Sequence, residues 1–216
     1  MQYRILRTTV AGELGVTDTA PTPLKITICG LEELPGHGRG GAVTHVLSIL
    51  DPGWPEPEAL GGFDVHRRLK LHFHDVIEEL PGWIAPERWD VELLLTFARD
   101  LDAVGHGAGS ESVAPHLLVH CHAGVSRSTA AAILILAQRD PGQSARDVVG
   151  RVIRLRPRAW PNLRMIEFGD ALLGRQGEIV AAVRALYRLV LDRDPGLAEA
   201  MIGNGRGREV AAAALA

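Results

Sequence analysis

Residues 117–137 read LLVHCHAGVSRSTAAAILILA, and this stretch decides the fold. Its first three residues, 117–119, are apolar and predict a short buried strand. From residue 128 to 139 the pattern is helical and rich in Ala, Ile and Leu, and a Pro-Gly pair follows it. A strand that passes through a tight, glycine-containing loop into a helix is typical of α/β proteins. Such loops lie at the carboxyl edge of a parallel sheet.

The rest of the chain repeats this alternation of strand and helix. Short apolar or alternating runs between turn residues predict strands, and apolar residues at helical spacing predict helices. The expected strands are 24–31, 42–50, 65–75 and 116–120, and the expected helices are 88–104, 128–139, 144–156, 163–174 and 178–194. This order predicts an α/β fold with a central, mostly parallel sheet flanked by helices. We expect a single domain over 1–195 and a C-terminal tail, 196–216, that is either helical or disordered.

The composition is that of an ordinary globular protein. Of the 216 residues, 46% are hydrophobic and 23% are charged, and the formal net charge is −3. Such a balance carries no whole-chain signature for nucleic acid or for an anionic membrane, so we expect neither as a partner. Two cysteines form no disulfide framework, and the first residues lack the apolar core of a signal peptide. The expected location is therefore cytoplasmic.

The loop between the strand and the helix has the chemistry of an anion site. Successive backbone N–H groups of such a loop point inward, and the helix dipole adds positive charge. Arg127 closes the loop and can hold two oxygens of a phosphate group. Cys121 begins the loop in the same positive field, which favours the thiolate over the thiol. Ser126 and Ser128 can form hydrogen bonds inside the loop, and Ser128 is placed to donate to the sulfur.

The segment HCHAGVSRS, residues 120–128, resembles the signature of the cysteine-dependent protein tyrosine phosphatase superfamily: His-Cys, five residues, Arg, then Ser or Thr. The Gly-x-Ser-Arg-Ser form is most similar to the dual-specificity branch and its compact bacterial relatives. This resemblance implies a phosphatase-like fold and a phosphocysteine intermediate, without metal or cofactor. It also implies that Cys121 is the nucleophile, that His120 shapes the loop, and that phosphate is bound by His122, Ala123, Gly124, Val125, Ser126 and Arg127.

A phosphate leaving group needs a proton from a nearby carboxyl group. The resemblance places this general acid after a strand and before the helix that precedes the cysteine, which is the position of Asp75. Asp90 is the alternative, because its separation from Cys121 is nearer the usual family spacing. However, an aspartate at the start of a helix normally caps it. The choice of Asp75 implies inserted loops at 76–89 and 105–115.

The resemblance continues downstream and covers about residues 24–175. The segment RPRAWPNLRMIEFGDALL, residues 156–173, is similar to the family segment of Arg-Pro, Pro-Asn and a closing helix. It implies that Asn162 braces the phosphate loop by hydrogen bonds. A turn residue after Pro161 is the structural alternative, and it is compatible with that role.

Two sets of residues allow a second interpretation. The His72-x-His74 and His120-x-His122 pairs could suggest a metal site, but no cysteine or carboxylate cluster completes a ligand set. We therefore expect no metal. Cys29 is expected to be a buried strand cysteine, although some relatives form a disulfide between a second cysteine and the nucleophile.

The expected function is hydrolysis of phosphomonoesters by a protein tyrosine or dual-specificity phosphatase. The loop has no lysine and no second arginine, which favours phosphoprotein monoesters over polyphosphorylated inositols. Phosphotyrosine is the first expectation, and phosphoserine, phosphothreonine and small phosphomonoesters remain open. Two alternatives are a phosphate-binding pseudo-phosphatase with weak turnover and a rhodanese-type sulfurtransferase. The second would need neither Asp75 nor the serines that flank Arg127.

Overall fold

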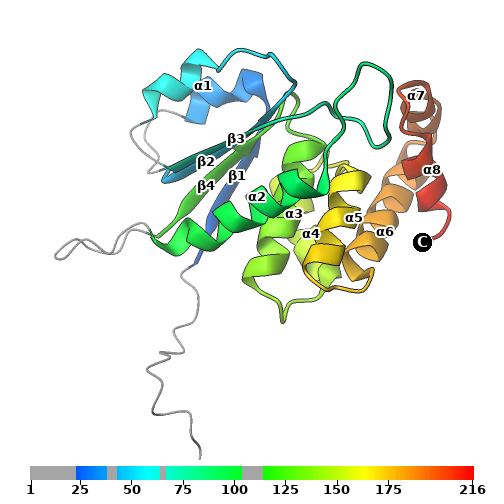
Figure 1. The fold of residues 1–216 in the computed structure, drawn as a ribbon. Coiled ribbons are helices and arrows are strands. Elements are labelled where there is room, and N and C mark those ends of the chain that lie inside the picture. Colours follow the sequence, from blue (N-terminus) through cyan, green and yellow to red (C-terminus); the bar gives the residue numbers. More distant parts are fainter. Residues whose placement is uncertain (1–22, 38–42, 64–66, 104–113) are drawn as a thin grey trace, which may run out of the picture.

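The computed structural model describes residues 23–37, 43–63, 67–103 and 114–216. Most of the inserted loop expected at 105–115 lies outside these ranges. The described strands are β1 (Lys25–Cys29), β2 (His45–Leu50), β3 (Arg67–His72) and β4 (His116–His120). They form one sheet in the order β1-β4-β2-β3, and all three pairings are parallel. The predicted fold class, a central parallel sheet flanked by helices, is confirmed (Figure 1).

The two faces of the sheet are covered differently. Residues of one parity, such as Leu47, Ile49 and Val119, belong to the large core beneath helices α2 to α6. Residues of the other parity, such as Val46 and Leu118, pack in a smaller cluster beneath α1 and the segment before β3. Figure 1 shows α1 on one side of the sheet and the larger group of helices on the other. Both faces are thus buried, as the apolar strands predict.

Most helices lie where the apolar periodicity places them. The helices up to residue 193 are α1 (Leu34–His37), α2 (Arg88–Arg99), α3 (Arg127–Arg139), α4 (Ala145–Leu155), α5 (Leu163–Leu172) and α6 (Glu178–Arg193). The described residues also include short 3-10 helices at Leu31–Glu33, Glu58–Gly62 and Asp100–Ala103. Ser144 caps α4 as expected, because its side chain accepts a hydrogen bond from the Asp147 N–H at 3.1 Å. The third strand is shorter than expected, since it ends at His72 and leaves Asp75 in a loop.

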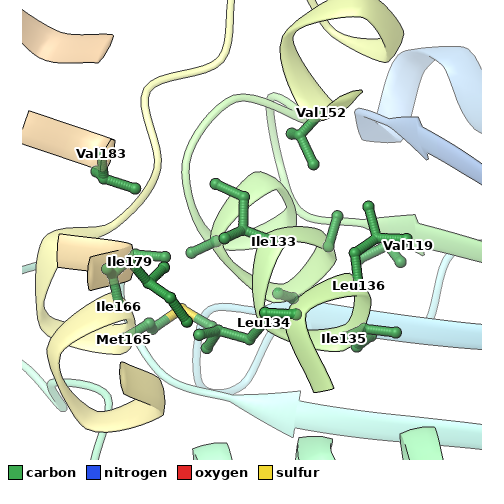
Figure 2. Close-up of a cluster of buried hydrophobic side chains, with 14 of the residues drawn as sticks. Val119, Ile133, Leu134, Ile135, Leu136, Val152, Met165, Ile166, Ile179 and Val183 are labelled. Atoms are coloured by element: carbon green, nitrogen blue, oxygen red, sulfur yellow. The ribbon is translucent and has the colours of Figure 1, made fainter. Parts of the chain in front are cut away.

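Helix α3 is the centre of the large core. Every residue from Ser128 to Ala137 is buried, which explains why its sequence is apolar on all sides. Its Leu134 lies so close to α5 that a Cβ atom on Gly169 would come within 2.2 Å of Leu134 Cδ2. Figure 2 shows Leu134 beside Met165 and Ile166 of α5, with Ile179 and Val183 of α6 on the same side of α3. This packing fixes the direction in which α3 leaves the loop after β4.

The C-terminal segment is helical. Helices α7 (Leu197–Gly203) and α8 (Gly207–Ala213) follow α6, and α8 lies against α6 (Figure 1). Ala212 and Ala213 of α8 are buried in the large core. Of the two expectations for residues 196–216, the structure has the helical one, while the domain boundary at residue 195 stays a prediction. Across the described ranges, no helix combines the length and apolar character needed to traverse a bilayer.

The carboxylate of Asp170 in α5 holds the start of α6. Its Oδ1 accepts from the Gly177 N–H at 2.6 Å, and its Oδ2 accepts from the N–H groups of Ile179 at 2.8 Å and Val180 at 3.2 Å. These donors have no partner within their own helix turn. The side chain is buried, so the bonds are shielded from water.

We predict that Asp170→Ala lowers the free energy of unfolding by about 2 kcal/mol, because it removes a charged cap from three helix N–H groups. Urea denaturation monitored by circular dichroism measures this change. Asp192→Ala is the control: this aspartate is an exposed ion-pair partner of Arg188 on α6 and should contribute less than about 0.5 kcal/mol. Equal effects of the two substitutions would contradict the capping role.

Candidate active site

The loop between β4 and α3 has its carbonyl groups bonded on its outer side. The His122 carbonyl accepts from the Leu31 N–H, and the Val125 carbonyl accepts from the Trp160 N–H, both at 2.9 Å. The carbonyls of residues 123 and 124 accept from the Arg156 guanidinium at 2.8 and 2.9 Å. The carbonyl of residue 126 accepts from the Ala130 N–H at 3.0 Å.

This arrangement determines where the loop's N–H groups point. In a trans peptide the C=O and the following N–H point in opposite directions. Since the carbonyls of residues 122–126 face outward, the N–H groups of residues 123–127 face the opposite side. That side is the cavity lined by Cys121, Val125 and Arg127. Together with the N-terminus of α3, these N–H groups form a cradle for an anion.

Two glycines allow the loop to lie against the end of β1. Gly124 has φ +68°, and a Cβ atom there would come within 2.5 Å of the Cys29 backbone. A Cβ atom on Gly30 would come within 2.9 Å of the His122 carbonyl oxygen. Arg156 secures the same region, because its Nη1 pairs with Glu33 Oε1 at 2.8 Å while its other nitrogens hold the loop. The cradle is therefore fixed by backbone contact and not by side chains alone.

The predicted nucleophile lies at the base of this loop. Cys121 Sγ is 3.2 Å from Ser128 Oγ, so the hydroxyl is placed to donate to the sulfur.

Arg127 is almost fully buried, and its Nη1 donates to Asp51 Oδ1 at 2.6 Å and to the Phe73 carbonyl. Within the described residues, the buried Arg127 Nε has no acceptor. A buried donor without a partner calls for an explanation, and an oxygen of a bound phosphate supplies one.

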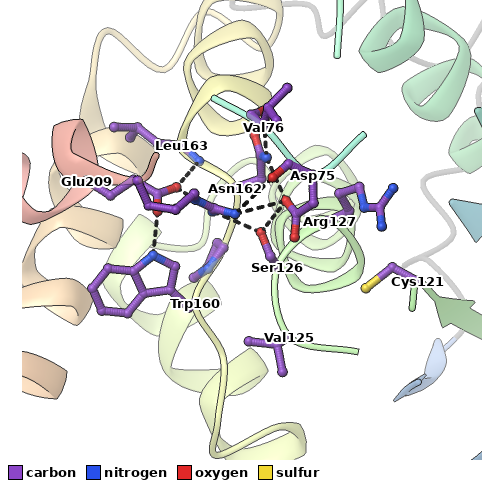
Figure 3. Close-up of polar contacts among 12 residues, drawn as sticks. Asp75, Val76, Cys121, Val125, Ser126, Arg127, Trp160, Asn162, Leu163 and Glu209 are labelled. Carbon is purple, nitrogen blue, oxygen red and sulfur yellow. Dashed lines mark hydrogen bonds and ion pairs between the residues drawn. The ribbon is translucent and has the colours of Figure 1, made fainter. Parts of the chain in front are cut away.

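Asp75 lines the same cavity as Cys121. Its Oδ1 accepts from Ser126 Oγ at 2.7 Å, from Asn162 Nδ2 at 2.9 Å and from Arg206 Nη1 at 3.1 Å. Figure 3 shows Asp75 between Ser126 and Asn162, with Cys121 and Arg127 nearby. The structure thus brings the expected acid, the phosphate loop and the expected brace Asn162 into one network.

Asp90 lies elsewhere. Its Oδ2 accepts from the Glu87 N–H at 2.8 Å at the start of α2, which is the capping contact expected for an aspartate in this position. Burial raises the pKa of Asp90, while the Glu87 N–H opposes that change. Asp90 does not line the cavity that holds Cys121 in the described part of the protein. Its geometry is that of a helix cap.

The two histidines beside the nucleophile are held as neutral rings. His120 Nε2 lies 2.6 Å from Ser48 Oγ, and burial lowers the pKa of His120 to about 4. His122 Nε2 accepts from the Asp51 N–H at 3.2 Å, and burial lowers the pKa of His122 as well. His122 also packs edge-on against Trp54, with ring centroids 4.4 Å apart. His120 therefore connects the start of the loop to β2 through Ser48, and His122 lies at the cavity wall.

Cys29 and His74 do not line the cavity that holds Cys121 in the described part of the chain. Cys29 is buried, as expected, and burial raises the pKa of its thiol to about 12. His74 Nδ1 accepts from the Ile84 N–H at 2.9 Å, and its ring packs against Trp83. Over the ranges that the structure describes, no three His, Cys, Asp or Glu side chains come together as a possible metal site.

Three charged residues of the site escaped the sequence analysis. Asp51 follows β2 and pairs with Arg127, and the only signal for it was its place at the end of a buried strand. Arg206 and Glu209 come from the tail, which lacks a clear apolar pattern. Arg206 contacts Asp75 and Ser126, and it also forms an ion pair with Glu209. Asp51 and Arg206 line the cavity that holds Cys121, which has a volume of about 790 Å³ and also reaches Trp83, Trp160, Val190, Leu197 and Met201.

No family model and no curated protein sequence matches the chain. Solved structures that resemble it include human DUSP28, at 20% identity and a TM-score of 0.45, over 69% of this chain and 94% of that chain. The Yvh1 phosphatase domain from Chaetomium thermophilum aligns at 21% identity and a TM-score of 0.43, over 73% and 94% of the two chains. The human tyrosine phosphatase-like serine/threonine/tyrosine-interacting protein aligns at 20% identity and a TM-score of 0.43, over 62% and 79%. With TM-scores below 0.5, this likeness carries no function over to the chain.

The burial of His120 makes stability depend on pH. Its folded pKa of about 4 lies below the ordinary value of 6.5, so the unfolded chain binds the proton more readily. This contribution to the free energy of unfolding is complete above pH 6.5 and is lost as the pH falls toward 4, by about 3 kcal/mol.

We predict that the wild type loses more stability than His120→Gln between pH 7 and pH 4. The measurement is urea denaturation at several pH values, with the difference between the two proteins taken at each. The pKa of His116 is also lowered to about 4, mainly by burial, so the variant keeps part of the pH dependence. A pH-independent difference between the two proteins would contradict the prediction.

Proposed function

We propose that the protein is a cysteine-dependent phosphomonoester hydrolase that acts on phosphoproteins or small phosphomonoesters. The observation that carries this proposal is the outward bonding of the carbonyls of residues 122–126, which turns five N–H groups toward the cavity beside Cys121. A phosphate dianion has the charge and the acceptor oxygens that such a cradle and Arg127 require. Cys121 lines the same cavity, so we assign its sulfur as the nucleophile toward a phosphorus atom bound there.

The first step transfers the phosphoryl group to the protein. The Cys121 thiolate attacks phosphorus, an S–P bond forms, and the bond from phosphorus to the leaving oxygen breaks with its electron pair on that oxygen. Asp75 gives its proton to the leaving oxygen from Oδ2, since Oδ1 already accepts three hydrogen bonds. The N–H groups of the loop and Arg127 stabilise the charge on the three other phosphate oxygens.

The second step restores the cysteine. The Asp75 carboxylate takes a proton from a water molecule while the oxygen of that water attacks phosphorus. The S–P bond breaks, and its electron pair stays on sulfur. Ser128 Oγ, at 3.2 Å from Sγ, donates to the departing thiolate and lowers its charge density. Inorganic phosphate leaves, and no metal ion is needed in either step.

We predict that the wild type releases phosphate from p-nitrophenyl phosphate and from phenyl phosphate in the presence of EDTA. Cys121→Ser should lower kcat by roughly 10³-fold or more for both substrates, because the nucleophile is lost. Asp75→Asn should lower kcat by roughly 10²-fold for phenyl phosphate and less for p-nitrophenyl phosphate, whose leaving group needs little protonation. Released phosphate and p-nitrophenol are the measured products.

Asp90→Asn is the matched control, and it should leave both rates within about twofold of the wild type. Phosphate or vanadate binding without hydrolysis by the wild type would overturn the proposal in favour of a phosphate-binding pseudo-phosphatase. Hydrolysis that survives Cys121→Ser would exclude the phosphocysteine mechanism.

A further inference from the structure

The C-terminal helix α8 reaches into the site through Arg206 at its N-terminal boundary. The side chain is only 8% exposed, although it carries a full charge. Its Nη1 donates to Asp75 Oδ1 at 3.1 Å, and its Nη2 donates to Ser126 Oγ at 3.0 Å. One guanidinium group thus contacts the proposed acid and the phosphate loop at once. Arg206 is 131 positions from Asp75 in the sequence and 80 positions from Ser126, so both contacts depend on the folded chain.

Glu209 holds Arg206 in this position from the other side. Its two oxygens accept from Arg206 Nη2 at 2.7 Å and from Arg206 Nε at 2.8 Å. They also accept from Trp160 Nε1 and from the Leu163 N–H, which Figure 3 shows. Burial opposes the charge of Arg206, but the bonds to Glu209 and the charge of Asp75 raise its pKa. The guanidinium therefore stays charged in a fixed orientation.

A buried ion pair of this kind contributes little to stability, because both charges lose their hydration. A role at the site accounts better for its position. Ser126 Oγ accepts a hydrogen bond from Arg206 and donates one to Asp75. The serine hydroxyl therefore connects the arginine to the carboxyl group by a second route, beside their direct contact. Every hydrogen bond of the Asp75 side chain in the described residues falls on Oδ1. Oδ2 therefore remains available to carry the proton.

We propose that Arg206 is a positioning residue that fixes the Asp75 carboxyl group against the phosphate loop, with Oδ2 directed to the leaving oxygen. This inference rests on the proposed function. In the acid form, Oδ1 is the carbonyl-type oxygen and accepts the same three bonds. As the proton passes to the leaving oxygen, negative charge develops on Asp75 beside the fixed positive charge of Arg206. The arginine acts through Asp75 and does not touch the phosphate group.

The test compares wild type and Arg206→Met with p-nitrophenyl phosphate and phenyl phosphate, in the Asp75 and Asp75→Asn backgrounds. We expect Arg206→Met to lower kcat roughly tenfold or more for phenyl phosphate and less than threefold for p-nitrophenyl phosphate, with KM nearly unchanged. In the Asp75→Asn background the same substitution should have no further effect on phenyl phosphate, because both changes remove one proton transfer.

Arg206→Met leaves Glu209 buried without its partner, so that variant is paired with Arg206→Met/Glu209→Gln, in which both charges are removed. The pair should give the same dependence on the leaving group. Arg206→Lys keeps a charge beside Asp75 and should recover part of the phenyl phosphate rate. Arg208→Met is the matched control on the same helix: Arg208 pairs with Glu167 and the Ile77 carbonyl and should leave both rates unchanged.

The outcomes separate the two proposals. If the wild type hydrolyses neither substrate, the proposed function fails and this inference fails with it. If the wild type is active and Arg206→Met slows both substrates equally, or slows phenyl phosphate as much in the Asp75→Asn background, only the positioning role is overturned. A rise in KM without a change in kcat would instead assign Arg206 to phosphate binding and would also overturn it.

Discussion

The site depends on one backbone constraint: the loop after β4 must turn the N–H groups of residues 123–127 to one side while the carbonyls of residues 122–126 accept hydrogen bonds on the other. The donors are Leu31 after β1, Arg156 at the end of α4, Trp160 before α5 and Ala130 of α3 itself. The loop therefore keeps its shape only when the sheet and these helices are assembled. A large, closely packed core beneath α3 is what makes the small loop rigid.

Parallel strands bring the remaining groups to the same edge. Asp51 follows β2, the Phe73 carbonyl and Asp75 follow β3, and Cys121 follows β4, so the carboxyl ends of three neighbouring strands meet around Arg127. This is the edge at which open α/β sheets bind their ligands. Another side of the cavity is lined by residues of α6 and α7 and by Arg206 at the N-terminal boundary of α8, while Trp83 and Trp160 add to its apolar wall.

Local patterns predicted much of this structure from the sequence. Helices α2 to α6 and the strand-loop-helix unit around Cys121 follow from periodicity and turn residues, which act over a few positions, whereas the short helix α1 was not predicted. Asp75 became the candidate acid through the family resemblance together with the strand before it, and its catalytic role stays a prediction. Arg206 and Glu209 were missed because α8 is seven residues long, and their partners are distant in sequence. A buried ion pair produces no repeating apolar pattern in the sequence, so it can be recognised only in the folded structure.

The pairing of Arg127 with Asp51 and the Phe73 carbonyl has a thermodynamic consequence for ligand affinity. An arginine side chain has large rotational freedom. If it becomes ordered only when a ligand binds, the loss of conformational entropy weakens the affinity for that ligand. Here one nitrogen is already anchored before any ligand arrives, and the side chain is almost fully buried. The entropy loss thus belongs to folding, and on the proposed function a dianion would bind to an arginine side chain whose conformation is already fixed.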